Sequence, residues 1–159
     1  MMLHKLMHNP VMAFLRKPCN ADVAKLALRV ALAAVFMRHG WMKLTGLEGT
    51  GMFFGKLGIP MPEVMAVVVA VTEFFGGLCI LLGLAVRFWS IGLMIDMVVA
   101  ILTALDVGSF KTYELEFSLL MMSLSLALSG AGAYGLDALL MKRGAGEHAA
   151  AMPVPAPKA

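Results

Sequence analysis

The stretch that decides the fold is PEVMAVVVAVTEFFGGLCILLGL, residues 62–84. Its charged side chains are Glu63, in the first turn, and Glu73, near the middle. A helix of about 20 predominantly apolar residues spans the hydrocarbon core of a bilayer. Because Pro62 and Glu63 both suit the first turn of a helix, the stretch predicts a membrane-spanning helix that begins at Pro62.

Three other segments approach this length and apolar character: residues 23–44, 88–105 and 113–129. The chain has 159 residues, of which 60% are hydrophobic and 14% are charged, and its mean hydropathy is +0.85. This apolar content exceeds what a soluble core of that size could bury, so much of it must face lipid. We therefore predict an all-α, polytopic membrane protein with a bundle of four transmembrane helices.

The predicted transmembrane domain, residues 22–143, lies between two terminal segments. Residues 1–21 are expected to be cytoplasmic and to include a short interfacial helix at residues 11–16. Residues 144–159 are rich in Ala and Pro without apolar periodicity, which predicts a disordered cytoplasmic tail.

Two further short helices are expected on the membrane surface, at residues 50–57 and 137–143. Asp137 is expected to cap the second of these helices, which ends in the cations Lys142 and Arg143. Neither segment is long enough to cross a bilayer.

Lysine and arginine near the helix ends predict the orientation. One side has Lys5, Arg16, Lys17, Lys25, Arg87, Lys142 and Arg143, and the other has Lys43, Lys56 and Lys111. The richer side should be cytoplasmic, which places both termini there, in a bacterial-type inner (cytoplasmic) membrane. Because the basic residues lie at the ends of apolar runs, they indicate the lipid bilayer as partner and not nucleic acid.

The ionisable side chains inside the predicted spans are Arg29, Arg38, His39, Glu73 and Asp96. Such groups are costly at membrane depth and usually face the bundle interior. Glu73 lies about 16 Å, and Asp96 about 13 Å, from the cytoplasmic ends of their helices, so both carboxyl groups lie near the midplane. If they are close, like-charge repulsion and desolvation create a proton-exchanging site; otherwise Asp96 is a lone protonated or lipid-boundary residue.

Small residues share a helix face with Glu73: Ala66, Ala70, Gly76 and Gly77. They permit the close approach of another helix, so Glu73 is expected to point into protein. Arg29 lies on one stripe of the first helix with Phe36, Gly40 and Lys43, and its long side chain is expected to reach Glu73. Such an ion pair either serves a site or only locks the helix packing.

The candidate catalytic residues, in proton exchange, are Glu73, Asp96 and His39, and the candidate cofactor-binding residues, through quinone or ion-pair contacts, are Arg29, Arg38 and Lys43. His39 could shuttle a proton or bind a quinone carbonyl. Arg38 lies opposite Arg29 on a helical wheel, so one of the two should snorkel or line a separate cavity. A single intramembrane histidine without further ligands does not predict a metal site.

Several short motifs lie between residues 24 and 140, and their order and spacing are informative together. They are Leu28-Arg29, Phe36, His39-Gly40, Lys43-Leu44, Gly46, Gly58-Ile59-Pro60, Glu73, Gly76-Gly77, Leu82-Gly83-Leu84, Arg87, Glu114 or Glu116, and Gly135-Leu136-Asp137. In these motifs the chain resembles the DoxX family of four-helix membrane proteins. The resemblance implies a redox association, because family members are similar to the membrane subunit of thiosulfate:quinone oxidoreductase and others are linked to quinone or thiol stress.

Three functions follow as hypotheses. The first is a quinone-linked redox component of a membrane oxidoreductase system, in which a cavity between helices binds the quinone head group. The second is a noncatalytic accessory or assembly subunit of a larger membrane complex, or a homo-oligomer, that packs through small-residue faces. The third is a small proton-coupled carrier built on the midplane acids. Whether the chain is an enzyme stays open between them.

Overall fold

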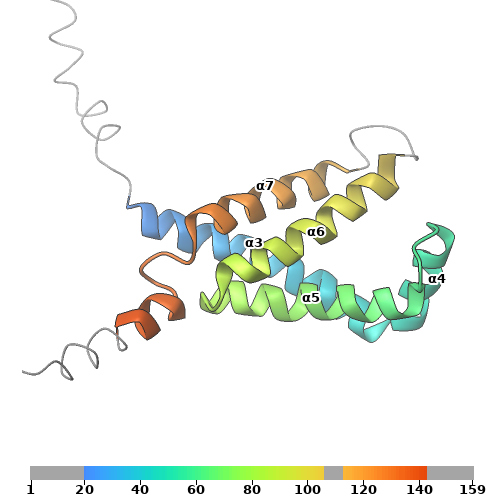
Figure 1. Ribbon diagram of the computed structural model, residues 1–159, viewed down its shortest axis with the longest axis horizontal. Helices are drawn as coiled ribbons and strands as arrows, with labels where there is room; N and C mark the ends of the chain where they lie inside the picture. Colours follow the sequence, from blue (N-terminus) through green and yellow to red (C-terminus); the bar gives the residue numbers. More distant parts are fainter. Residues whose placement is uncertain (1–19, 106–112, 143–159) are drawn as a thin grey trace, which may run out of the picture.

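The computed structural model describes residues 20–105 and 113–142, and these residues form helices joined by short turns (Figure 1). The helices are α3 (Ala21–Thr45), α4 (Leu47–Lys56), α5 (Pro62–Leu82), α6 (Val86–Leu105), α7 (Glu114–Ser129) and a short helix at residues 136–142. Because no strand occurs in this part of the chain, the prediction of an all-α fold is confirmed. The expected helix at residues 11–16 and the expected tail at 144–159 lie outside the described residues.

The four long helices overlap the four segments expected to cross the membrane, with shifts of a few residues at their ends. Two of them, α5 and residues Val86–Thr103 of α6, are long and apolar enough by themselves to cross a bilayer. Of the others, α7 has 16 residues, and α3 carries Arg29 and Lys43 on its inward stripe. Length and composition alone therefore single out two spans in the described residues.

The closest helix contact joins α3 to α5. A Cβ on Gly40 would overlap the backbone nitrogen of Phe74, so only glycine permits this approach. Three residues further along α5, a Cβ on Gly77 would lie 3.0 Å from the Met37 side chain. Of the small residues predicted around Glu73, Gly77 therefore packs against α3, whereas Gly76 packs against Trp89 on α6. Glu73 is buried, as expected. Helix α6 packs against α5 and α7, and α7 also contacts α3.

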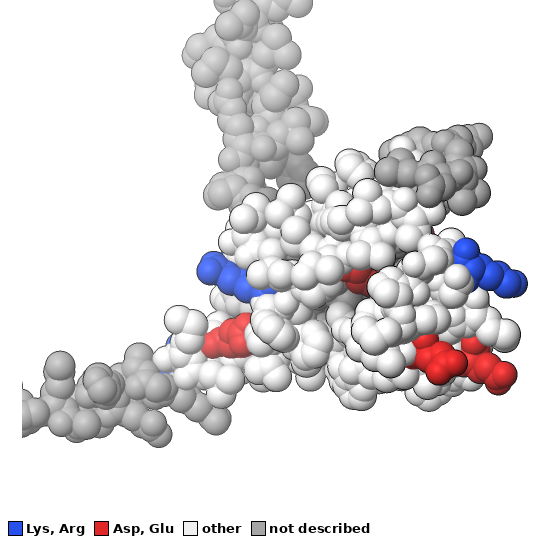
Figure 2. Space-filling view, turned by 45° about the vertical axis from the view of Figure 1, so that its right-hand side comes forward, with Lys and Arg blue, Asp and Glu red and all other residues white. Residues whose placement is uncertain are grey.

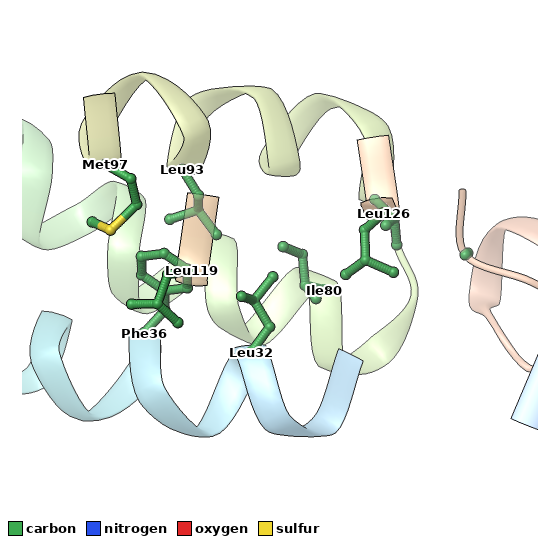
Figure 3. Packing of buried hydrophobic residues seen from close by; sticks show 9 residues of the cluster. Leu32, Phe36, Ile80, Leu93, Met97, Leu119 and Leu126 are labelled. Carbon is green, nitrogen blue, oxygen red and sulfur yellow. The ribbon is translucent and has the colours of Figure 1, made fainter. Parts of the chain in front are cut away.

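All four long helices contribute to one hydrophobic core, shown in Figure 3. Its largest members are Leu32, Phe36, Ile80, Leu93, Met97, Leu119 and Leu126. Most of the remaining large apolar side chains are exposed, on every long helix. On the face in Figure 2, charged side chains lie toward the two ends, and the middle is uncharged apart from a small acidic area.

Asp137 caps a different helix from the one predicted. Its carboxylate accepts hydrogen bonds from the amides of Ala85, at 2.8 Å, and Val86, at 3.3 Å, at the start of α6. Its own amide donates to the Gly83 carbonyl, which fixes the short C-terminal helix to the α5–α6 turn. The prediction that Asp137 caps its own helix is therefore wrong, because the fold brings uncapped α6 amides to it. This cap also explains why α6 begins at Val86 and not at Phe88.

Candidate functional site

A cavity of about 630 Å³ lies between α3, α4, α5 and α6, with α7 at its edge. Its polar lining residues are His39, Lys43, Thr72, Glu73, Asp96, Thr103 and Glu116. The rest of its wall is apolar and includes Phe36, Phe53, Phe54, Leu57, Ile59, Met65, Val68, Ile95, Met97 and Val99. The volume falls within the range of small-molecule sites, which are likewise mostly apolar with a few placed polar groups.

Lys43 and Glu73 form an ion pair at the inner wall of this cavity, between Lys43 Nζ and Glu73 Oε2. The contact of Gly40 with Phe74 explains it, because Lys43 lies one turn after Gly40 and Glu73 directly precedes Phe74. The Glu73 side chain is only 3% exposed, whereas that of Lys43 is 24% exposed. A carboxylate buried to this degree needs a compensating charge, and Lys43 supplies it.

Asp96 brings a second carboxyl group to this pair. It projects from α6 and is placed to hydrogen-bond with the Glu73 carboxyl group, while its own Oδ2 is buried without a donor. The structure places Asp96 beside Glu73 and not alone at the lipid boundary, whereas the proton exchange expected for such a pair stays a prediction. Because two ionised carboxylates cannot donate to each other, such a hydrogen bond requires a proton on one of them. Lys43, Glu73 and Asp96, here called the carboxyl triad, can therefore hold one exchangeable proton.

Two further titratable side chains line the cavity. His39 lies on α3 on the more exposed side of the cavity, and Glu116 is half-buried on α7. Glu116 was not among the predicted site residues. The signal that could have indicated it is its spacing with Leu119, Ser123 and Leu126, which places it on the inward stripe of α7.

Arg29 does not reach Glu73, so the predicted Arg29–Glu73 interaction is wrong. Its guanidinium donates to three backbone carbonyl oxygens: Ile80, at 2.8 Å, Leu81, at 2.6 Å, and Ala131, at 3.1 Å. Carbonyls in the last turn of a helix lack intrahelical partners, and a cation is favourable there. Because Arg29 lies level with that end of α5, about 10 Å along the helix from Glu73, it binds these carbonyls instead.

The structure thus brings four of the six predicted site residues to one cavity: His39, Lys43, Glu73 and Asp96. Arg29 is buried at the opposite end of α5, and Arg38 is exposed on α3 away from the cavity wall. No group of three or more His, Cys, Asp and Glu side chains in the described residues is arranged to hold a metal ion.

Comparison with known proteins identifies the family to which the chain belongs. The sequence model of the DoxX family matches residues 24–106. "Putative oxidoreductase CatD" of Bacillus subtilis is 35% identical over 122 residues, which cover 76% of this chain and 90% of that protein. "Inner membrane protein YqjF" of Escherichia coli is 32% identical over 129 residues, which cover 77% of this chain and 95% of that protein.

A second Escherichia coli protein, "Inner membrane protein YphA", is 27% identical over 128 residues, which cover 72% of this chain and 89% of that protein. No solved structure matches the chain significantly. The matched region includes most of α3 and all of α4, α5 and α6, and hence every member of the carboxyl triad. From the family match and the similarity to these relatives, the chain belongs to the DoxX family of membrane proteins.

Proposed function

We propose that this protein crosses the membrane with four helices and serves as a quinone-linked component of a membrane oxidoreductase system. The observation that carries the proposal is the carboxyl triad in the wall of a mostly apolar cavity. The name of the Bacillus subtilis relative, "Putative oxidoreductase CatD", agrees with a redox role.

Charge compensation supports the proposal that α3 crosses the membrane. Arg29 is satisfied by three carbonyl oxygens and Lys43 by Glu73, so neither cation needs water. Ionisable residues in membrane helices are tolerated when they pair inside the bundle in this way. Helix α7 is about 24 Å long, and exposed apolar side chains such as Leu115, Phe117 and Leu128 lie along it. With α5 and α6 these make four crossings, and both termini would then be cytoplasmic.

The cavity fits a quinone head group. A quinone ring is flat and apolar, and its two carbonyl oxygens accept hydrogen bonds. Lys43 and a protonated carboxyl of the triad are donors on the inner wall, and Phe36, Phe54 and Leu57 supply apolar contact. When bound, a quinone takes two electrons, here from a partner oxidoreductase, together with two protons to become a quinol.

Each residue of the triad has a distinct role in this proposal. Asp96 holds the exchangeable proton and donates it toward a ligand oxygen in the cavity. Glu73 accepts a proton in turn, and Lys43 compensates its charge while it is ionised. His39, on the exposed side of the cavity, passes protons between this group and water.

A binding measurement tests the proposal. Proteoliposomes that contain the full chain are titrated with a long-chain quinone, and the Asp96→Asn variant is compared with Glu63→Gln, whose exposed carboxylate lies on α5 outside the cavity. We expect Asp96→Asn to lose quinone affinity and Glu63→Gln to retain it. If folded Asp96→Asn binds as the wild type does, the cavity is not the quinone site. Failure of the wild type to bind, with a larger enzyme copurifying, would make the chain an accessory subunit.

A further inference from the structure

One side of the cavity wall is also part of the outer surface of the protein. Val68 on α5, Ile95 and Val99 on α6, and Phe53 on α4 line the cavity, yet they are 48%, 61%, 42% and 56% exposed. A residue that both lines a cavity and is exposed lies at its opening. These four residues, here called the apolar rim, carry no polar side-chain atom.

The opening follows from how α5 and α6 pack. Near their connecting turn the two helices touch, and a Cβ on Gly76 would lie 3.0 Å from the Trp89 ring. About one helical turn further from the connecting turn, a Cβ on Gly92 would lie 3.5 Å from the Thr72 methyl group. Beyond this point α5 and α6 diverge, as Figure 1 shows, and the cavity occupies the space between them.

Two other directions from the carboxyl triad are more closed, whereas the exposed His39 marks a polar part of the opening on α3. Toward the Arg29 end the interior is filled by the hydrophobic core, in which Leu32, Phe36 and Leu93 are buried (Figure 3). At the opposite end, α4 packs on α5 and its Phe54 is 8% exposed. Three of the four residues of the apolar rim lie on α5 and α6, so the exposed apolar side of the cavity faces the gap between these two helices.

We infer that the cavity opens sideways into the hydrocarbon layer between α5 and α6, and that its ligand enters from the lipid phase. The ligand class is a lipid-soluble molecule with an uncharged polar head at Glu73 and Asp96 and an apolar tail against the apolar rim. An uncharged head fits because Lys43 already neutralises Glu73, and an apolar tail fits because the rim lacks polar groups. The inference rests on the proposed function for the membrane crossing, but the route does not depend on a quinone as the ligand.

Reagents of different solubility test this route. Dicyclohexylcarbodiimide dissolves in lipid and adds to a protonated carboxyl group, which transfers its proton to the reagent nitrogen as the carboxyl oxygen bonds to the central carbon. A water-soluble carbodiimide does the same from the aqueous phase. Proteoliposomes with the full chain are treated with each reagent, and the labelled residue is located by peptide mass spectrometry. We expect the lipid-soluble reagent to label the Glu73–Asp96 pair and the water-soluble reagent to leave it unlabelled.

Two tryptophan variants provide the matched comparison. Ile95→Trp fills the apolar rim and should slow the labelling severalfold, whereas Ile91→Trp, one turn away on the same exposed face but outside the cavity lining, should not. Labelling by the water-soluble reagent at a similar rate, equal labelling of both variants, or no labelling at all would overturn the route. Quinone titration of the same samples separates the two ideas, because labelling without quinone binding refutes the proposed ligand and retains the lateral opening.

Discussion

Lys43 on α3 forms an ion pair with Glu73 on α5, directly beside the contact between Gly40 and Phe74 where these helices are closest. The ion pair therefore depends on the packing of the two helices, and it forms part of the cavity wall. The glycine contact sets the level at which the lysine meets the glutamate, and the glutamate in turn contacts Asp96. Loss of either partner is therefore expected to affect both stability and ligand binding.

Removal of Lys43 should strongly destabilise the protein. In Lys43→Met, Glu73 remains buried without its cation, which costs roughly 3–5 kcal/mol for a buried pair. The double variant Lys43→Met with Glu73→Gln should recover part of this loss, since no uncompensated charge remains. Thermal denaturation in lipid nanodiscs measures both, with Lys56→Met, an exposed lysine at the end of α4, as control. Additive effects of the two single substitutions would contradict the pairing.

Arg29 should matter for stability and not for the ligand. Arg29→Lys keeps the charge but loses the fork that binds three carbonyl oxygens, at a cost of about 1–3 kcal/mol for each charged hydrogen bond left unmade. The variant should denature at lower temperature, yet its folded fraction should bind quinone with wild-type affinity. Normal stability together with lost quinone affinity would instead place Arg29 in the binding site.

The close approach of α3 and α5 should not tolerate a methyl group added at Gly40. Gly40→Ala places a Cβ against the backbone of Phe74, which cannot move without displacing Glu73, so we expect a large loss of stability. Gly49→Ala is the matched control, because nothing lies within 4 Å of its Cβ position and alanine favours a helix. The two denaturation temperatures should differ clearly. Similar values for both variants would show that the helices are further apart.

Asp137 should hold the start of α6. Asp137→Ala removes the acceptor of the Ala85 and Val86 amides, and the loss of such a cap typically costs about 1 kcal/mol. Hydrogen exchange followed by mass spectrometry should show faster exchange in the peptide that contains the α5–α6 turn, with α3 unchanged. Unaltered exchange there would mean that Asp137 does not cap α6.

The sequence predicts those features that depend on one helix. Small residues on the Glu73 face indicated a buried glutamate, and the apolar runs indicated the four long helices. The partner of Glu73 could not be predicted in this way, because it depends on the position of α3 along the axis of α5. That register is set by the contact of Gly40 with Phe74, and it brings Lys43 to Glu73 instead of Arg29. The cap by Asp137 likewise joins residues that only the complete fold brings together.

The central claim is that the carboxyl triad contacts the quinone head group and holds an exchangeable proton. Infrared difference spectroscopy of the reconstituted protein, recorded as quinone binds, tests it most directly. We predict a change in the carbonyl band of a protonated carboxyl group in the wild type, and its loss in folded Asp96→Asn. A difference spectrum without a carboxyl band, or one that Asp96→Asn leaves unchanged while quinone still binds, would contradict the claim.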